Sequence, residues 1–325
     1  MCTAITYYTK NHYFGRNLDF EHDFGESIVV TPRNYKFTFQ CGSTVDPHPS
    51  MIGMAVTDND YPLYFDAVNE DGLCMAGLYF PGNAVYLQAM EDMYNIAPYE
   101  FIPWVLCQCR SVQEAKKLLH RTNLVNIPYS EDYPQAPLHW FIADRTSAIT
   151  VEPGVEGLVL YDNPIGVLTN NPPFPYHMHN LNNYLNVTSD APTSRFAPDY
   201  TLTPYSRGMG GMGLPGDLSS ASRFVRAAFT KLNSVSDDCE DESVTQFFHI
   251  LGSVIQQKGC VKVGNGYEKT IYSSCCNIDK GIYYYTTYEN PQISAVYLKN
   301  TDYIGNRITK IPLLTELQVR IQHSY

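Results

Sequence analysis

The first 80 residues alternate between short apolar or aromatic runs and polar turns, a pattern typical of β-strands. The runs are rich in β-branched and aromatic residues, which suit a pleated backbone. Polar sequences such as Lys10-Asn11-His12 and Glu70-Asp71-Gly72 read as turns between them. We expect strands at Ala4–Tyr8, Tyr13–Arg16, Ser27–Thr31, Tyr35–Phe39, Met51–Val56, Tyr64–Asn69 and Met75–Phe80.

Helical spacing of apolar residues follows. Ile102–Cys109 is apolar enough for a buried helix, and a second helix is expected at Val112–Leu119 behind a capping box of Ser111 and Glu114. Apolar residues recur at helical spacing again over 221–232 and 247–255. For the last of these helices, Ser243 and Gln246 form a second potential capping box.

Further strands are expected between and after these helices, at Leu138–Asp144, Ala148–Glu152, Gly157–Tyr161, Val167–Thr169, Thr270–Cys276, Ile282–Tyr288 and Ile293–Leu298. The segment 186–217 is rich in Pro, Gly and Ser, has no clear period, and is expected to leave the core as a long excursion. No composition break or fixed repeat divides the chain. We therefore predict one α+β domain over residues 1–325, with helices covering sheet faces.

Composition and charge exclude several classes of protein. The chain has 325 residues, a hydrophobic content of 44% and a net charge of −11, which argues against nucleic acid or an anionic membrane as partner. We find no run of about 18 apolar residues and no leader pattern, so we expect neither a membrane span nor a signal peptide. The 9 irregularly spaced cysteines favour reduced, mostly buried thiols in a cytoplasmic protein.

Three motifs lack the context that their usual function needs. The glycine pattern from Gly208 to Gly213 follows no apolar strand and is interrupted by Pro215, so dinucleotide binding is not expected. No third ligand accompanies His177 and His179 at a recognisable spacing. Cys107-x-Cys109 falls in an apolar helix. We therefore predict no metal and no cofactor.

Cys2 is the strongest candidate for chemistry. It follows Met1, and removal of that methionine would place a thiol and a free α-amine on one residue. An α-amine has a pKa near 8, so it can act as general base for its own side chain. This is the N-terminal nucleophile arrangement, in which an adjacent base activates a weak nucleophile.

Four polar residues in apolar surroundings could complete such a site. Arg16 and Asp19 follow the first hairpin, where they could favour the thiolate and hold the α-amine, or form a structural ion pair. Asn170 ends an apolar strand and could donate to a developing oxyanion, although Asn near Pro is also common in turns. Arg223 lies near the start of a helix, where the macrodipole does not favour a cation, so the arginine could be there to serve the site. The alternative is an ordinary solvated arginine.

Together these residues resemble the choloylglycine hydrolase family, which comprises bile salt hydrolases and penicillin V acylases. The matching motifs run through the chain: Met1-Cys2-Thr3, Phe14–Asp19, Asn69–Leu73, Asn163–Asn170, Gly213–Asp217, Ala221–Phe224 and Gly281–Asn290. The resemblance implies a four-layer αββα sandwich of the N-terminal nucleophile hydrolase type, cytoplasmic and usually a homotetramer. It also implies that the excursion at about 186–217 serves subunit assembly.

The resemblance assigns roles to the candidate residues. Cys2 would be the nucleophile and, through its α-amine, the base, with Asp19 orienting that amine. Arg16 and Arg223 would maintain the charge balance of the site. Asn170 would supply one oxyanion donor, and the backbone N–H of Tyr79 would supply the other.

Position 79 departs from the bile salt hydrolase pattern, which has Asn there, whereas penicillin V acylases often have Tyr. The predicted function is hydrolysis of the amide of glycine- or taurine-conjugated bile acids, with the sterol in an apolar pocket. By resemblance, Leu18, Tyr129 and Tyr133 would line that pocket. Two alternatives remain open: a penicillin V acylase, suggested by Tyr79, and a non-catalytic binding or scaffold protein of the same fold.

Overall fold

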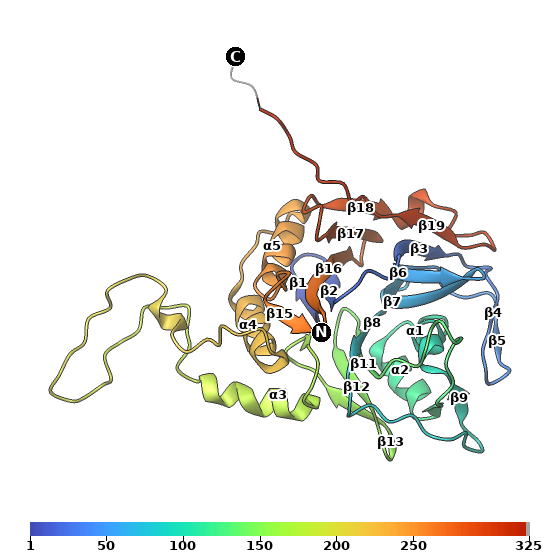
Figure 1. Ribbon diagram of the computed structural model, residues 1–325, viewed down its shortest axis with the longest axis horizontal. Coiled ribbons are helices and arrows are strands. Elements are labelled where there is room, and N and C mark those ends of the chain that lie inside the picture. Colours follow the sequence, from blue (N-terminus) through green and yellow to red (C-terminus); the bar gives the residue numbers. More distant parts are fainter. Residues whose placement is uncertain (323–325) are drawn as a thin grey trace.

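The computed structural model describes residues 1–322 and contains two large antiparallel sheets (Figure 1). The first sheet carries the start of the chain at its centre. Its strands lie in the order β14 (Val167–Leu168), β1 (Cys2–Tyr8), β2 (His12–Phe20), β16 (Gly266–Asn277), β17 (Ile282–Thr287) and β18 (Ser294–Tyr297), with β15 (Val261–Val263) paired to β16.

The second sheet has eight strands. Their order is β13 (Gly157–Asp162), β12 (Ala148–Gly154), β11 (Leu138–Ala143), β8 (Cys74–Tyr79), β7 (Tyr61–Asn69), β6 (Met51–Asp58), β3 (Ser27–Thr31) and β19 (Thr309–Pro312). Two short ribbons accompany it, formed by β4 (Phe37–Thr38) with β5 (Thr44–Val45) and by β9 (Tyr94–Ile96) with β10 (Thr122–Leu124).

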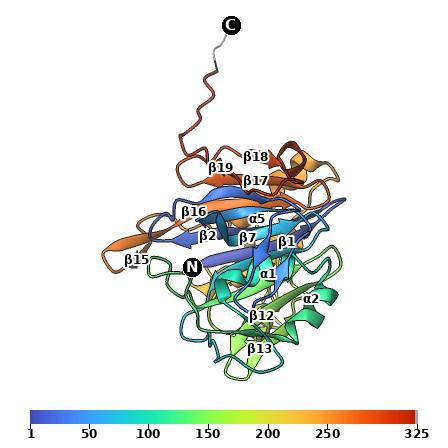
Figure 2. The same cartoon turned by 90° about the vertical axis from the view of Figure 1, so that its right-hand side faces the viewer.

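Helices cover the outer face of each sheet (Figure 1), and Figure 2 views the molecule from the side of one helical layer. Helices α4 (Ser220–Asn233) and α5 (Glu240–Gly252) pack on the first sheet, and α1 (Phe101–Leu106) and α2 (Val112–Leu119) pack on the second. Helix α3 (Phe174–Asn180) follows β14. Four 3₁₀ turns lie at Pro98–Glu100, Leu181–Tyr184, Met209–Gly211 and Leu298–Asn300. The expected αββα sandwich is confirmed.

Inner strands of the second sheet, such as β3, β8 and β11, are buried on both faces, which explains why they are apolar at nearly every position. In β8, Cys74 and Ala76 face the core between the sheets, whereas Met75 faces the core beneath α1 and α2. In β3, Ile28 faces the core between the sheets and Val29 faces the core beneath α1 and α2. Successive side chains of a strand point to opposite faces, so a sheet covered on both sides needs an apolar residue at each position.

Tight packing within the first sheet depends on a glycine in β2. A Cβ built on Gly15 would lie 2.0 Å from the carbonyl oxygen of Ser274 in β16. The closeness of the two backbones therefore excludes any side chain at this position. This contact lies next to Arg16 and helps to fix β2 against β16.

Several expected elements differ in detail. The strand predicted at Tyr35–Phe39 is reduced to β4, and helix α3 was not predicted. The capping box of Ser243 and Gln246 is wrong, because α5 already begins at Glu240 with Cys239 as its N-cap. Acidic residues in the first turn favour that earlier start. Ser111 does cap α2 by accepting a hydrogen bond from the Glu114 N–H.

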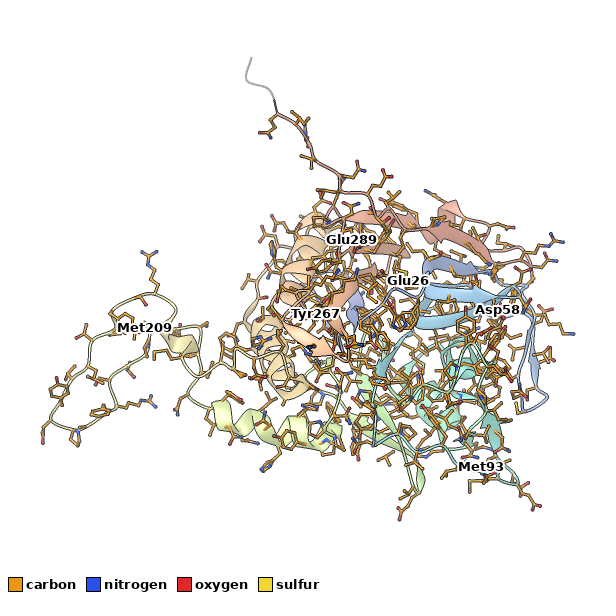
Figure 3. All side chains as sticks on the ribbon, in the orientation of Figure 1. Glu26, Asp58, Met93, Met209, Tyr267 and Glu289 are labelled. Carbon is orange, nitrogen blue, oxygen red and sulfur yellow. The ribbon has the colours of Figure 1, made fainter. Side chains whose placement is uncertain are left out.

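The segment 186–217 runs out from the body of the molecule, as the sequence indicated (Figure 1, yellow). Figure 3 labels Met209 on this excursion. Large apolar side chains on it are exposed, among them Phe196 at 78% and Tyr205 at 83%. Among residues 1–322, no helix is long and apolar enough to cross a membrane. All nine cysteines are free, and six of them are buried.

Candidate active site

Cys2 lies at the first position of β1 and is 3% exposed. Its cross-strand partner is Leu18 of β2. The backbone N–H of Cys2 donates a hydrogen bond to Asn170 Oδ1 at 2.7 Å, and its carbonyl accepts one from Arg223 Nη1. The backbone of the candidate nucleophile is therefore held on both sides by polar side chains that come from distant parts of the chain.

Arg223 is fully buried in the first turns of α4, whose N-cap is Ser219. Its guanidinium donates to Thr3 Oγ1 and to Asn170 Oδ1, each at 2.7 Å. Burial lowers the pKa of Arg223, and the nearby charges of Asp19 and Cys2 oppose that shift. The planar fork of the arginine side chain thus joins β1 to the end of β14.

Asp19 is fully buried on β2, beside Thr270 of β16 in the strand register. Its Oδ1 accepts a hydrogen bond from the Thr270 hydroxyl. Its Oδ2 has no hydrogen-bond partner among the described residues and lies 3.9 Å from Arg223 Nη1. Burial raises the pKa of Asp19, while Arg223 opposes the rise. One carboxylate oxygen is thus available to a further donor.

Arg16 belongs to β2, and its guanidinium lies where strands β7 and β8 of the other sheet separate. Its Nη1 donates to the carbonyl oxygens of Phe65 at 3.1 Å and Gly77 at 2.5 Å, just beyond the last paired residues, Asp66 and Ala76. Burial opposes the charge, but Cys2 and other nearby groups raise the pKa of Arg16 overall. The guanidinium remains a cation beside the thiol, and a cation favours the thiolate.

Asn170 and Tyr79 meet at the end of the site. Asn170 Nδ2 donates to the carbonyl oxygen of Tyr79 at 2.7 Å, which leaves its second amide hydrogen free. The N–H of Phe80 bonds to Pro137, so the alternation of an antiparallel ladder directs the N–H of Tyr79 away from β11. Two N–H donors therefore lie together near Cys2.

A cavity of about 900 Å³ lies beside this cluster. Its apolar walls include Phe20, Leu218 and Val261, and Tyr79 and Met1 also line it. Cys2 is not among its lining residues. Met1 therefore stands on the cavity side of Cys2.

Glu268 and Thr270 were missed by the sequence analysis. Glu268 is 4% exposed on β16 and pairs with the α-ammonium group of Met1, which also donates to the Asp19 carbonyl at 2.7 Å. Thr270 holds Asp19. The contacts of both residues depend on how β16 pairs with β2, and no local sequence motif marks either residue.

The three expected pocket residues do not line this cavity. Leu18 is buried opposite Cys2, so its side chain neighbours the thiol on the same sheet face. The rings of Tyr129 and Tyr133 pack against each other, and Tyr129 also stacks with Tyr61. These contacts direct both tyrosine rings into an aromatic cluster instead of the cavity wall.

The described residues offer no group of three or more His, Cys, Asp or Glu side chains placed to hold a metal. His177, considered as a ligand from its spacing to His179, is buried, and its Nε2 donates to the Asn170 carbonyl at 2.9 Å. The polar groups around Cys2 are instead suited to activating a thiol and to binding a developing negative charge.

A buried thiol at the head of the first strand of an αββα sandwich defines the class of N-terminal nucleophile hydrolases. The sequence places the chain within that class: residues 2–309 match the model of the linear amide C–N hydrolases, choloylglycine hydrolase family. The chain belongs to this family.

Relatives of known name agree with this membership. The chain is 54% identical to a bile salt hydrolase/transferase of Lactiplantibacillus plantarum, with 98% of each chain covered. It is 40% identical to a bile salt hydrolase/transferase of Clostridium perfringens, with 95% of each covered.

Solved structures show the same fold. A mutant conjugated bile acid hydrolase from Clostridium perfringens matches with a TM-score of 0.92 and 38% identity, covering 99% of this chain and 100% of the other. A penicillin V acylase from Agrobacterium tumefaciens matches with a TM-score of 0.78 and 17% identity, covering 97% and 92%. The second likeness concerns the fold alone.

Proposed function

We propose that this chain hydrolyses the amide bond of glycine- or taurine-conjugated bile acids, with Cys2 as nucleophile. The observation that carries the proposal is the cluster of Arg16, Asp19, Asn170 and Arg223 around Cys2, in a chain 54% identical to a bile salt hydrolase/transferase. Neither a metal nor a cofactor takes part in the proposed reaction.

Removal of Met1 prepares the site. It frees the α-amine of Cys2 and takes away Met1, which lines the cavity in the structure whereas Cys2 does not. The new amine loses the constraint of the peptide bond and lies near Asp19, whose Oδ2 has no other donor among residues 1–322. Asp19 then holds the amine so that its lone pair faces the thiol.

Acylation follows in two stages. The α-amine takes the proton of the thiol, and the thiolate, favoured by Arg16, attacks the carbonyl carbon of the substrate. The carbonyl oxygen becomes an oxyanion that receives hydrogen bonds from Asn170 Nδ2 and the Tyr79 backbone N–H. The C–N bond then breaks, and the α-ammonium of Cys2 gives its proton to the leaving glycine or taurine nitrogen.

Deacylation reverses these roles. The neutral α-amine removes a proton from a water molecule, and the resulting hydroxide attacks the thioester that links the bile acid to Cys2. The second tetrahedral intermediate uses the same two donors. Its collapse releases the free bile acid and the thiolate of Cys2, and the α-ammonium returns its proton to that thiolate.

The cavity supports a large apolar acyl group. Its volume of about 900 Å³ and its walls of Phe20, Leu218 and Val261 suit a sterol body. Contacts of Leu18, Tyr129 and Tyr133 with the substrate stay a prediction. A homotetramer assembled through the 186–217 excursion and a cytoplasmic location also stay predictions.

A penicillin V acylase is the second candidate, because the phenol of Tyr79 lines the cavity where bile salt hydrolases usually have an amide. The purified protein should be assayed with taurocholate, glycocholate and penicillin V, after mass spectrometry has established the N-terminal residue. We expect turnover of both bile salts to exceed that of penicillin V. A strong preference for penicillin V would select the second candidate, and activity with Met1 retained would refute the proposed mechanism.

A further inference from the structure

A buried histidine lies directly behind Asn170. His139, on β11, has no exposed surface, and its Nε2 is 2.9 Å from the carbonyl oxygen of Thr169. Its Nδ1 is 3.3 Å from Glu152 Oε1, on the adjacent strand β12. Glu152 is itself 5% exposed. The proposed mechanism uses neither residue.

The hydrogen bonds determine where the protons lie. A carbonyl oxygen only accepts, so His139 must carry hydrogen on Nε2. The contact between Nδ1 and Glu152 then requires one more proton, held either by the imidazole or by the carboxyl group. In both cases the pair is neutral overall and keeps its donor directed at Thr169, which suits its burial.

The same pair fixes the segment on both sides of Asn170. Glu152 Oε1 also accepts the N–H of Phe174 at 2.8 Å, at the start of α3. Asn170 itself donates its N–H to Ser220 Oγ at 2.8 Å and accepts from His177 at the carbonyl. The backbone from Thr169 to Phe174 is therefore anchored to β11, β12 and α4.

His139 also contacts the segment that carries the other proposed donor. Its ring stacks on Phe80 with the centroids 4.2 Å apart and the planes 7° from parallel. Phe80 directly follows Tyr79. One imidazole thus touches both chain segments that supply an N–H to the reacting carbonyl.

We propose that His139 and Glu152 are positioning residues for the oxyanion donors of Asn170 and Tyr79. The inference rests on the proposed function in taking those two groups as the donors. The pair keeps the ends of β8 and β14 at a fixed separation, so that the two N–H groups converge on one oxygen. It therefore acts on the transition state and not on binding of the ground-state substrate.

Three variants test the pair: His139→Phe, His139→Gln and Glu152→Gln. His139→Phe keeps a ring against Phe80 but loses both polar contacts, and we expect kcat to fall roughly 10- to 100-fold, less than for outright loss of a donor, with KM nearly unchanged. His139→Gln restores a donor near Thr169 and should recover part of kcat. Glu152→Gln should lower kcat by roughly three- to tenfold, because Oε1 serves both His139 Nδ1 and the Phe174 N–H, and an amide nitrogen in its place could donate to Nδ1 but could not accept from Phe174.

The matched control is His12→Phe, which replaces another buried histidine whose ring nitrogens have no partner among the described residues. It should leave kcat unchanged. The rate of Cys2 alkylation by iodoacetamide should be the same in all variants, since the nucleophile is not altered. A kcat for His139→Phe within threefold of the unmodified protein, or an effect on KM alone, would overturn the inference.

Two further outcomes are distinguishable. If His139→Phe does not fold, the other two variants decide, and a kcat within about threefold of the unmodified protein in both His139→Gln and Glu152→Gln would overturn the inference. If the unmodified protein cleaves neither bile salts nor penicillin V, the proposed function fails. The pair is then tested by acylation of Cys2 with p-nitrophenyl acetate, which needs the same donors, and an unchanged acylation rate in His139→Phe would overturn it.

Discussion

The side-chain amide of Asn170 donates a hydrogen bond to the backbone carbonyl of Tyr79 at 2.7 Å, across 91 positions of sequence. This contact joins the end of β14, in the first sheet, to the end of β8, in the second. The oxygen of the same amide accepts from the Cys2 N–H and from Arg223. Asn170 is thus the point at which both sheets and α4 meet the candidate nucleophile.

Cys2→Ala should abolish turnover of conjugated bile acids, because the proposed acyl-enzyme forms on the thiol of Cys2. Cys260→Ala is the matched control: its thiol is exposed and lines the same cavity. It should keep near-normal kcat. Release of taurine from taurocholate measures both variants, and residual activity in Cys2→Ala above background would remove the thiol from the mechanism.

Asn170→Ala should lower kcat by about 10²–10³, the usual cost of removing one oxyanion donor. The change also deletes the acceptor for the Cys2 N–H and for Arg223, so the loss should lie at the upper end of that range. Steady-state kinetics on taurocholate provide the measurement. An unchanged kcat would show that this amide does not contact the reacting carbonyl.

Arg223→Lys should reduce kcat at least tenfold, although it keeps the charge. A lysine cannot reproduce the fork that reaches Cys2, Thr3 and Asn170 together. Arg226→Lys, on the same helix but bonded to the carbonyls of Ser253 and Pro215, is the control and should have a much smaller effect. Equal losses in the two variants would indicate a general requirement for arginine in α4.

Tyr79→Asn should change substrate preference more than rate. The backbone N–H persists, whereas the phenol leaves the cavity wall and an amide replaces it. We expect kcat on taurocholate to stay within a few-fold and the ratio of bile salt to penicillin V turnover to rise. A fall of that ratio would assign the phenol to bile salt binding.

His12→Phe should flatten the pH dependence of stability between pH 4 and 6.5. Burial, aided by the charges of Arg145 and Lys231, lowers the pKa of His12 from 6.5 to about 4, despite the nearby carboxylates of Asp279 and Asp144. Because the unfolded chain binds the proton first, the free energy of unfolding falls as pH decreases through this window, by up to about 3 kcal/mol.

Phenylalanine can keep the stacking of position 12 on Tyr8, whose ring centroid lies 4.5 Å away, and it does not titrate. Urea unfolding at several pH values measures the effect. The variant should be at least as stable as the unmodified protein at pH 5, since the histidine ring makes no hydrogen bond within the described residues. An unchanged slope against pH would assign the acid sensitivity to other groups.

The parts of the fold that depend on local pattern could be predicted from the sequence. Strands such as β1, β3 and β6 are rich in β-branched or aromatic residues, and Ser111 marks the start of α2. The start of α5 could not be read from the Ser243 motif, because a residue with capping chemistry was also available at Cys239 and acidic residues followed it.

Some residues of the candidate site could also be predicted from the sequence, and others could not. Cys2, Arg16, Asp19, Asn170 and Arg223 were singled out because polar residues stand in apolar surroundings or match a family motif, and the structure gathers them. Thr270 and Glu268 could not be found, because their contacts depend on how β16 aligns with β2. His139 and Glu152 lie within apolar strands, and only the pairing of β11 with β12 brings them together.

The position of Arg16 in the gap between β7 and β8 has a mechanical consequence. Its guanidinium is attached to the main chain at Gly77, two residues before Tyr79 on the same strand. Any bending or sliding of that strand would displace the positive charge and the Tyr79 N–H in concert. Substitutions beneath the second sheet that alter its curvature should therefore weaken thiolate formation and oxyanion binding together, even though they contact neither the Arg16 guanidinium nor the Tyr79 N–H.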